Sequence, residues 1–449
     1  MKGISMVGCI SDDSANRCCD HSSRRFCSCA AFLLGLLSAN NIVYVFTIGN
    51  TPIYLICIYA AVLNVVLAIR QPRDANKLLA IVPGLFLLYL GCVALSSISV
   101  LLFHGDYSYQ FITGLINLVL FLNVAGSVIM LRKDLNWIIL GVGAGILLNA
   151  VISAYVYYLS TRGVIFSLDF IFPNAGIQVP NEWNDFRARG LFKEPGHLAR
   201  YLTISFFLVM FVYPWRKKLP QIALFLIMIV LMGMTRSSSV ALFAIALIIY
   251  MVFSNQGNKA TAGIIALSAF AVMAIIYLVF IPTENYWVLA MRESLLDPFS
   301  QSGGNMVREQ GFAYGLELFF LHPIMGNGWN TVTPLFHEYG FYGATDLFGT
   351  YSYVLTSLVH IGLPGTVVLI VFLLGSAFKL LRVSSWRAGH AVGAAALMLF
   401  MILLTTDLGL EDACSCLVLG VLFLALWYQK NVFSTEAGNT FDSQTSVIE

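Results

Sequence analysis

FITGLINLVLFLNVAGSVIML, residues 111–131, is an uninterrupted run without a charged side chain, and Arg132 and Lys133 follow it directly. A helix needs about 20 mostly apolar residues to cross the hydrocarbon core of a membrane. The run therefore predicts a spanning helix. Similar runs recur along the chain and predict about twelve spans, near 30–48, 53–69, 78–103, 111–131, 137–158, 198–215, 219–235, 238–254, 262–281, 350–378, 389–406 and 413–428.

The composition agrees with an integral membrane protein. Of the 449 residues, 59% are hydrophobic and 11% are charged, and the mean hydropathy is +0.82. A soluble domain carries about 25% charged residues, so this chain cannot cover a water-facing surface of its size. We expect an all-α, polytopic membrane protein. Binding of nucleic acid is disfavoured, because the chain has no clustered basic domain.

The distribution of basic residues predicts the orientation. With the N-terminus in the cytoplasm, 17 of the 25 lysines and arginines fall on cytoplasmic segments, and the external turns near 49–52, 104–110 and 407–412 hold none. This is the asymmetry of the positive-inside rule. It predicts a multi-pass membrane protein with both termini in the cytoplasm. The expected parts are a tail 1–29, a membrane domain 30–428 with external loops 159–197 and 282–349, and a tail 429–449.

Eight basic residues oppose that asymmetry because they fall on the external side. An anionic ligand on that face would favour them, whereas long loops can also cross the membrane regardless of charge. Translocation of a long loop regardless of charge explains Arg292 and Arg308, which lie in the long loop. It does not explain Arg236 well, because Arg236 lies in a tight turn. The others lie in or beside the first loop: Arg162, Arg187, Arg189, Lys193 and Arg200.

The segment 187–200, RARGLFKEPGHLAR, runs into an apolar helix. Pro195 and Gly196 suit the first turn of that helix, and Glu194 would complement its dipole. A helix start does not require two arginines and a lysine just upstream. Cations that converge on a helix N-terminus form an anion site, and a diphosphate suits one.

The second external loop holds a further predicted element. Residues 305–320 could form an amphipathic helix with Phe312, Leu316, Phe319 and Phe320 on one face. Such a helix would either lie along the membrane interface or cap a cavity. The tryptophans of the two loops could stack on sugar rings or anchor the loops at the interface.

Four segments resemble one family when they are taken in order. Arg187, Gly190, Phe192 and 194–196 (Glu-Pro-Gly) are similar to the Arg-x-x-Gly-x-Phe-x-Glu-Pro-Gly motif of O-antigen and exopolysaccharide polymerases of the Wzy type. The segment 321–329 (LHPIMGNGW) resembles a loop motif of the O-antigen ligase and polymerase superfamily. The remaining two are 235–237 (Thr-Arg-Ser) and 357–365 (SLVHIGLPG).

The resemblance has two departures, and both concern histidine. Family members often carry His-Asn before the helix that follows the long loop, where this chain has 348–353 (FGTYSY). His360 stands where the family commonly has a glutamate. His337, on the loop itself, is then the best-placed histidine for a role with substrate.

The resemblance implies a multi-span, GT-C-like glycosyltransferase of the bacterial inner membrane that uses no metal or cofactor. Its partners would be an undecaprenyl-diphosphate-linked oligosaccharide, the lipid bilayer and, as a further candidate, a chain-length regulator. Arginines would neutralise the leaving diphosphate, and Glu194 or His337 would receive the acceptor proton. Glu194 could instead hold Arg189 in place. The candidate catalytic residues are Arg189, Glu194, Arg236 and His337, and the candidate substrate-binding residues are Arg187, Lys193, Arg292, Arg308, Trp183 and Trp329.

Two other functions compete with polymerisation. A ligase that transfers glycan to lipid A core would share the donor chemistry, and the Glu-Pro-Gly motif favours the polymerase. A lipid-linked oligosaccharide flippase or another transporter would place ionisable groups at mid-membrane and show repeated halves. The spans of this chain carry almost no charge, and its polar residues concentrate in external loops.

Overall fold

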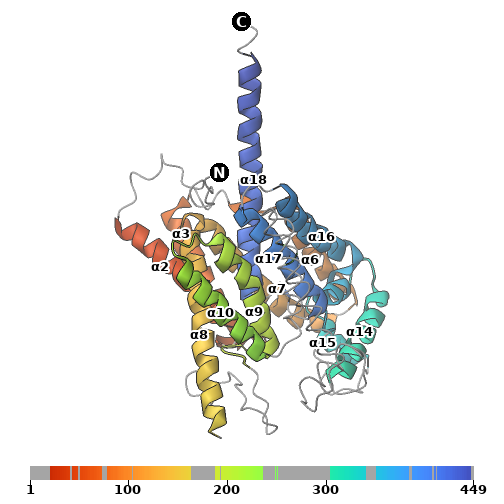
Figure 1. The fold of residues 1–449 in the computed structure, drawn as a ribbon. Helices are drawn as coiled ribbons and strands as arrows, with labels where there is room; N and C mark the ends of the chain where they lie inside the picture. The colour runs from red at the N-terminus through yellow and green to blue at the C-terminus, as the bar shows by residue number, and fades with distance from the viewer. Residues whose placement is uncertain are drawn as a thin grey trace.

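A computed structural model shows a mostly helical membrane protein (Figure 1). Within the described residues, seven helices are long and apolar enough to cross a membrane. The structure describes residues 21–40, 43–48, 51–72, 78–103, 105–162, 188–192, 194–235, 248, 250, 304–339, 350–383, 387–406, 409–410 and 412–445.

The N-terminal part of the chain holds six of the described helices. They are α2 (His21–Leu37), α3 (Leu55–Arg70), α5 (Leu78–Ile81), α6 (Gly84–Phe103), α7 (Ser108–Met130) and α8 (Leu135–Thr161). The C-terminal part holds α9 (Pro195–Phe207), α10 (Lys218–Thr235), α14 (Gly304–Leu321), α15 (Val332–Glu338), α16 (Tyr353–Val383), α17 (Arg387–Thr405) and α18 (Ala413–Thr445). A π-helical turn, Leu208–Val212, extends α9.

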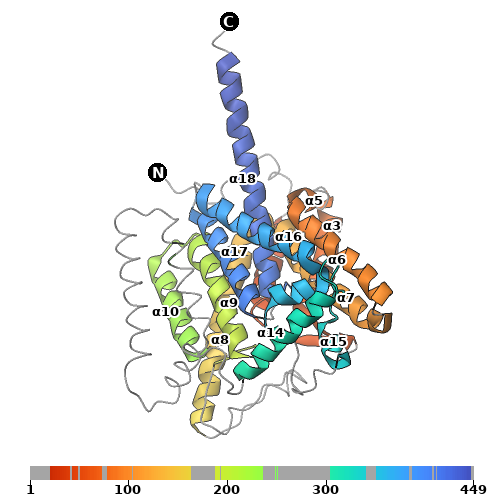
Figure 2. The same ribbon diagram turned by 90° about the vertical axis from the view of Figure 1, so that its right-hand side faces the viewer.

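Helix α18 begins inside the bundle, and its C-terminal turns project beyond it (Figures 1 and 2). Its first turns are almost completely buried, which fits their apolar and small side chains. The end of the bundle opposite this projection holds the start of α9, the end of α8 and the helices α14 and α15 (Figure 1). We call it the distal end.

Small residues let α2 and α8 pack closely. A β-carbon at Gly35 would collide with the backbone oxygen of Ile138, and one at Gly141 would collide with that of Phe32. Close backbone approach at small residues is a common way for helices to associate in lipid. Partly buried polar side chains join α3 to α7: Asn64 donates to the side chain of Asn123 (3.0 Å) and accepts from Ser127 (2.8 Å).

The predicted span at 30–48 is wrong as a single helix. Helix α2 ends at Leu37, and the chain then forms an antiparallel hairpin of β1 (Tyr44–Ile48) and β2 (Thr51–Tyr54). The sequence explains the difference, because β-branched and aromatic residues flank Gly49-Asn50, a dipeptide typical of tight hairpins. Apolar content alone does not separate such strands from a helix.

Two other predicted spans are interrupted. The stretch 78–103 divides into α5 and α6 at Pro83, since proline lacks the N–H that a helix interior needs. The stretch 350–378 breaks at Gly362, which has a φ of 71°. The predicted spans at 238–254 and 262–281 lie almost entirely outside the described residues.

The other predicted spans coincide with helices within a few residues. Helices α7 and α8 cover 111–131 and 137–158, and α10 covers 219–235. The predicted helix at 305–320 is confirmed as α14, but its expected apolar face is not its buried face, since Phe312 and Phe320 are exposed and Leu318 is buried. Helix α18 continues to Thr445, through much of the stretch expected to be a C-terminal tail.

Candidate functional site

Residues 188–192, which we call the arginine loop, are fixed to α8 by one buried side chain. Asn149 accepts a hydrogen bond from the N–H of Leu191 (2.7 Å) and donates to the carbonyls of Ala39 (2.9 Å) and Gly145 (2.8 Å). Gly190 has a φ of 54°, and a β-carbon there would collide with the Asn149 side chain. Only glycine meets both demands without strain.

Two further contacts fix the same loop. Phe192 is buried, and its ring centroid lies 5.3 Å from that of Tyr201 on α9. The N–H of Ala188 donates to the carbonyl of Met234 (2.8 Å), in the last turn of α10. The arginine loop therefore contacts the last turn of α10, which ends at Thr235, the residue before Arg236 in the sequence. Arg189 remains partly exposed on this loop.

The start of α9 follows the arginine loop, and its form matches the expected helix start. Glu194 occupies the N-cap position with extended backbone, and Pro195 begins the helix. The Glu194 side chain is 70% exposed and lies 3.9 Å from Nε2 of His197. A β-carbon at Gly196 would lie 3.9 Å from Nη2 of Arg200, which places that guanidinium beside the first turn. The guanidinium of Arg200 and the positive end of the α9 dipole thus share one small region.

Asp412 is a residue of this region that was not selected from the sequence. Its carboxylate caps α18 by accepting from the N–H and the hydroxyl of Ser415 (3.0 and 3.2 Å). Burial raises the pKa of this carboxyl, and the positive charge of Arg200 partly offsets the effect. The signal available in the sequence was an aspartate directly before an apolar run, as at many helix N-caps.

The second region of interest is the contact between the 322–328 loop and the break in α16. Because Pro364 has no N–H, the carbonyl of His360 loses its helical partner. That carbonyl accepts from the N–H of Gly328 instead (2.9 Å). In return, Leu363 donates to the carbonyl of Pro323 (2.8 Å). We call this arrangement the α16 joint.

Glycine is required where the two chains of the α16 joint meet. Gly326 and Gly362 have φ values of 74° and 71°. A β-carbon at Gly326 would collide with the backbone of His360 and would lie 2.6 Å from the nitrogen of Gly362. Asn327 adds backbone and side-chain bonds to Val359 (2.6 and 3.3 Å). The glycines Gly326 and Gly362, one from each of the segments 321–329 and 357–365, thus allow the two backbones to pack together.

Trp329 and His360 complete the α16 joint with their side chains. The two ring centroids are 5.3 Å apart, and Trp329 is only 1% exposed. A sugar therefore has no free face of this indole to stack on in this conformation. Trp329 instead packs inside the protein, so its side chain does not reach the membrane interface in this conformation either.

The other predicted site residues divide by location. His337 is exposed near the end of α15, and Arg308 belongs to α14 without a described side chain. Both helices lie at the distal end, as does the start of α9 (Figures 1 and 2). Arg187, Lys193, Arg236, Arg292 and Trp183 lie outside the described residues.

In the described part of the site, Arg189, Arg200 and the N-terminal end of α9 are the groups whose charge suits an anion. Within that part, no group of three or more His, Cys, Asp or Glu side chains could hold a metal ion. A comparison with protein-family models found no match to the chain, and a comparison with curated proteins found none either.

Proposed function

We propose that this protein polymerises lipid-linked oligosaccharide repeat units at the external face of a bacterial inner membrane. The observation that carries the proposal is the arginine loop: Asn149, Gly190 and Phe192 fix its backbone, while Arg189, five residues before the N-cap residue Glu194, stays partly exposed. Rigid backbone under a charged side chain suits recognition of a diphosphate. The resemblance to O-antigen and exopolysaccharide polymerases rests on four motifs in the family order.

In the proposed reaction, a hydroxyl of the acceptor repeat unit attacks the anomeric carbon of the donor glycan. The bond between that carbon and the diphosphate oxygen breaks, and undecaprenyl diphosphate leaves with the electron pair. Arg189 neutralises the departing charge, together with Arg187, Lys193 and Arg236 from the adjoining sequence. Fixed cations that oppose developing charge are among the largest contributions to catalysis.

The proton of the acceptor hydroxyl goes to Glu194 in this proposal. Its carboxylate is exposed, and Glu194 lies five residues from Arg189 on the segment that leads into α9. His337 lies on α15, a separate element. We therefore place Glu194 as the proton acceptor and His337 in contact with the glycan.

Deletion of the gene in the native bacterium tests the proposal, with surface glycans and lipid-linked glycans analysed by gel and mass spectrometry. A polymerase predicts that long chains disappear while single repeat units still reach their acceptor. Bare acceptor, with polymer retained on the lipid carrier, would instead identify a ligase. Unchanged glycans would refute both transferase functions. Complementation with the wild-type gene should restore the original chain-length pattern.

A further inference from the structure

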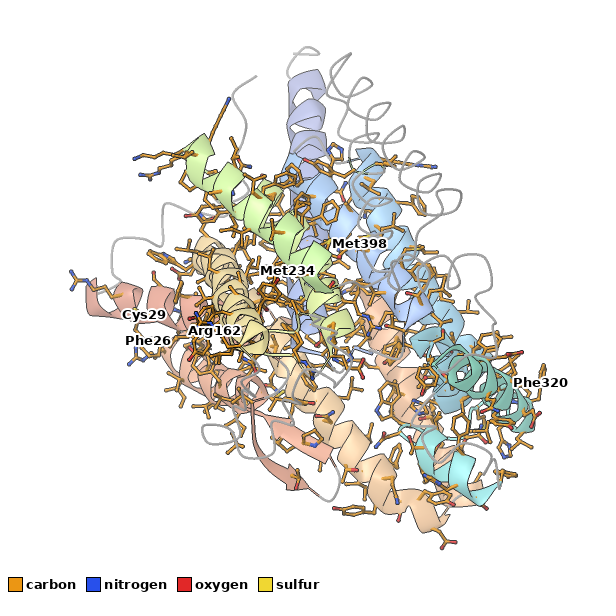
Figure 3. The ribbon with its side chains drawn as sticks, turned by 60° about the horizontal axis from the view of Figure 1, so that its bottom comes forward. Phe26, Cys29, Arg162, Met234, Phe320 and Met398 are labelled. Carbon is orange, nitrogen blue, oxygen red and sulfur yellow. The ribbon has the colours of Figure 1, made fainter. Side chains whose placement is uncertain are left out.

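The corner between α14 and the α16 joint carries exposed apolar side chains. Phe320 is 70% exposed and Ile324 is 72% exposed, and Leu321 and Met325 are exposed beside them. Figure 3 shows Phe320 at the rim of the molecule, pointing away from the bundle. We call residues 320–325 the apolar corner. Exposed apolar patches of this kind mark an interaction surface.

The apolar corner continues an exposed apolar stripe on α16. Leu363, Val367, Val371 and Phe378 are all exposed, and their spacing places them on one helical face. The stripe ends at the basic residues Lys379 and Arg382, which are also exposed. An apolar stripe on a spanning helix, closed by basic residues, is typical of a surface that faces lipid.

The stripe on α16 is too short to match the bilayer by itself. At about 1.5 Å per residue, Leu363 to Phe378 covers about 22 Å, whereas the hydrocarbon core is about 30 Å thick. The stripe does not continue before Leu363, because Gly362 breaks the helix and residues 351–362 have no exposed side chain. Apolar residues next to Leu363 would supply the missing depth of about 8 Å.

The apolar corner occupies that position. The N–H of Leu363 donates to the carbonyl of Pro323 (2.8 Å), inside the corner itself. We propose that the apolar corner inserts into the lipid at the distal end of the bundle and holds α14 and α15 at the membrane surface. Two exposed carboxylates, Glu309 and Glu317, remain on α14. Because charge is costly in hydrocarbon, only the C-terminal end of α14 enters the lipid.

This proposal chooses between the two positions that the sequence left open for the amphipathic helix, the membrane interface and a cavity cap. It favours the interface, with an insertion point that includes the turn after the helix. It does not depend on the proposed enzymatic function. A membrane protein of any activity could carry such an anchor.

Cysteine labelling in lipid nanodiscs tests the insertion. Phe320→Cys and Ile324→Cys would be reacted with a membrane-impermeant maleimide, with His337→Cys on α15 as the exposed control. Mass spectrometry of each peptide gives the labelling rate relative to the denatured chain. We expect both corner positions to react at least tenfold more slowly than position 337. Equal rates at the corner and at the control would overturn the proposal.

A second measurement separates lipid from a protein partner. Ile324→p-benzoylphenylalanine, irradiated in nanodiscs, should form an adduct with phospholipid, whereas the same replacement of His337 should not. A crosslink to a second copy of the chain, without a lipid adduct at position 324, would overturn the proposal even if maleimide labelling were slow.

Discussion

The arginine loop and the α16 joint both lie in segments that the sequence analysis selected as motifs, yet their side chains differ in exposure. In the α16 joint, Trp329 and His360 are buried and the glycines permit backbone contact. In the arginine loop, Gly190 and Phe192 are likewise buried, but Arg189 is not. The comparison teaches that a motif can combine buried residues that hold the backbone with a charged residue whose side chain is partly exposed.

This difference leads to opposite expectations for substitution. A change in the α16 joint should cost stability, and activity should fall only as folded protein is lost. A change of an arginine in the loop should cost activity at nearly constant stability. The following variants test that separation, from the largest expected effect to the smallest.

Gly326→Ala should cause the largest loss of stability. The added methyl group would collide with the backbone of His360 at a positive φ, so we expect a loss of about 3–5 kcal/mol. Thermal unfolding in detergent, followed by size-exclusion chromatography, measures it. Gly375→Ala is the matched control, since its β-carbon would meet nothing within 4 Å. A Gly326→Ala protein as stable as this control would show that the joint does not hold the fold.

Arg189→Ala should lower chain extension by about 10²–10³-fold, the usual cost of removing one group that stabilises transition-state charge. The guanidinium is partly exposed, so the unfolding temperature should stay near the wild-type value. Glycan ladders from a complemented deletion strain give the activity. Arg189→Lys should restore only part of it, because lysine lacks the bidentate geometry. Normal ladders from Arg189→Ala would remove this residue from the proposed site.

Asn149→Ala should lower both the stability of the protein and its chain-extension activity. Its side chain is the buried link between α8 and the arginine loop. Leaving the N–H of Leu191 without a partner should cost about 1–3 kcal/mol and should also lower chain extension. Leu148→Ala, at an exposed neighbouring position, is the control. An active but destabilised Asn149→Ala protein would show that the loop position is unimportant for function.

Asp412→Asn should have the smallest effect. Asparagine caps helices about as well as aspartate, and burial already raises the pKa of Asp412 in the folded chain. The Asp412 carboxyl group therefore binds its proton more tightly in the folded chain than in the unfolded chain. As the pH rises from about 4 the carboxyl group loses that proton, and the stability of the wild-type protein should fall. Unfolding temperatures at several pH values should show this fall reduced in the variant. An equally steep fall in both proteins would contradict the assignment to Asp412.

The sequence predicted the parts of this fold that depend on long apolar runs, such as α7 and α8. It failed at 30–48 and around Gly362, where a hairpin and a helix break lie within equally apolar sequence. In both places turn chemistry, from Gly49-Asn50 and from Gly362 with Pro364, overrode apolar content.

In the candidate site, the sequence identified the helix start at Glu194 and Pro195 but neither Asn149 nor Asp412. Asn149 is 42 residues from the backbone group that it binds, and Asp412 is more than 200 residues from Arg200. Contacts over such distances depend on how the helices pack. A motif within one segment carries no information about them.

Binding of farnesyl diphosphate, a short water-soluble polyprenyl diphosphate, tests the central claim most directly. The purified wild-type protein, Arg189→Ala and Gly375→Ala would be compared in nanodiscs by isothermal titration calorimetry. Our account predicts that wild type and Gly375→Ala bind with similar affinity and that Arg189→Ala binds at least tenfold more weakly at an unchanged unfolding temperature. Equal affinity in all three proteins would contradict a diphosphate site at the arginine loop.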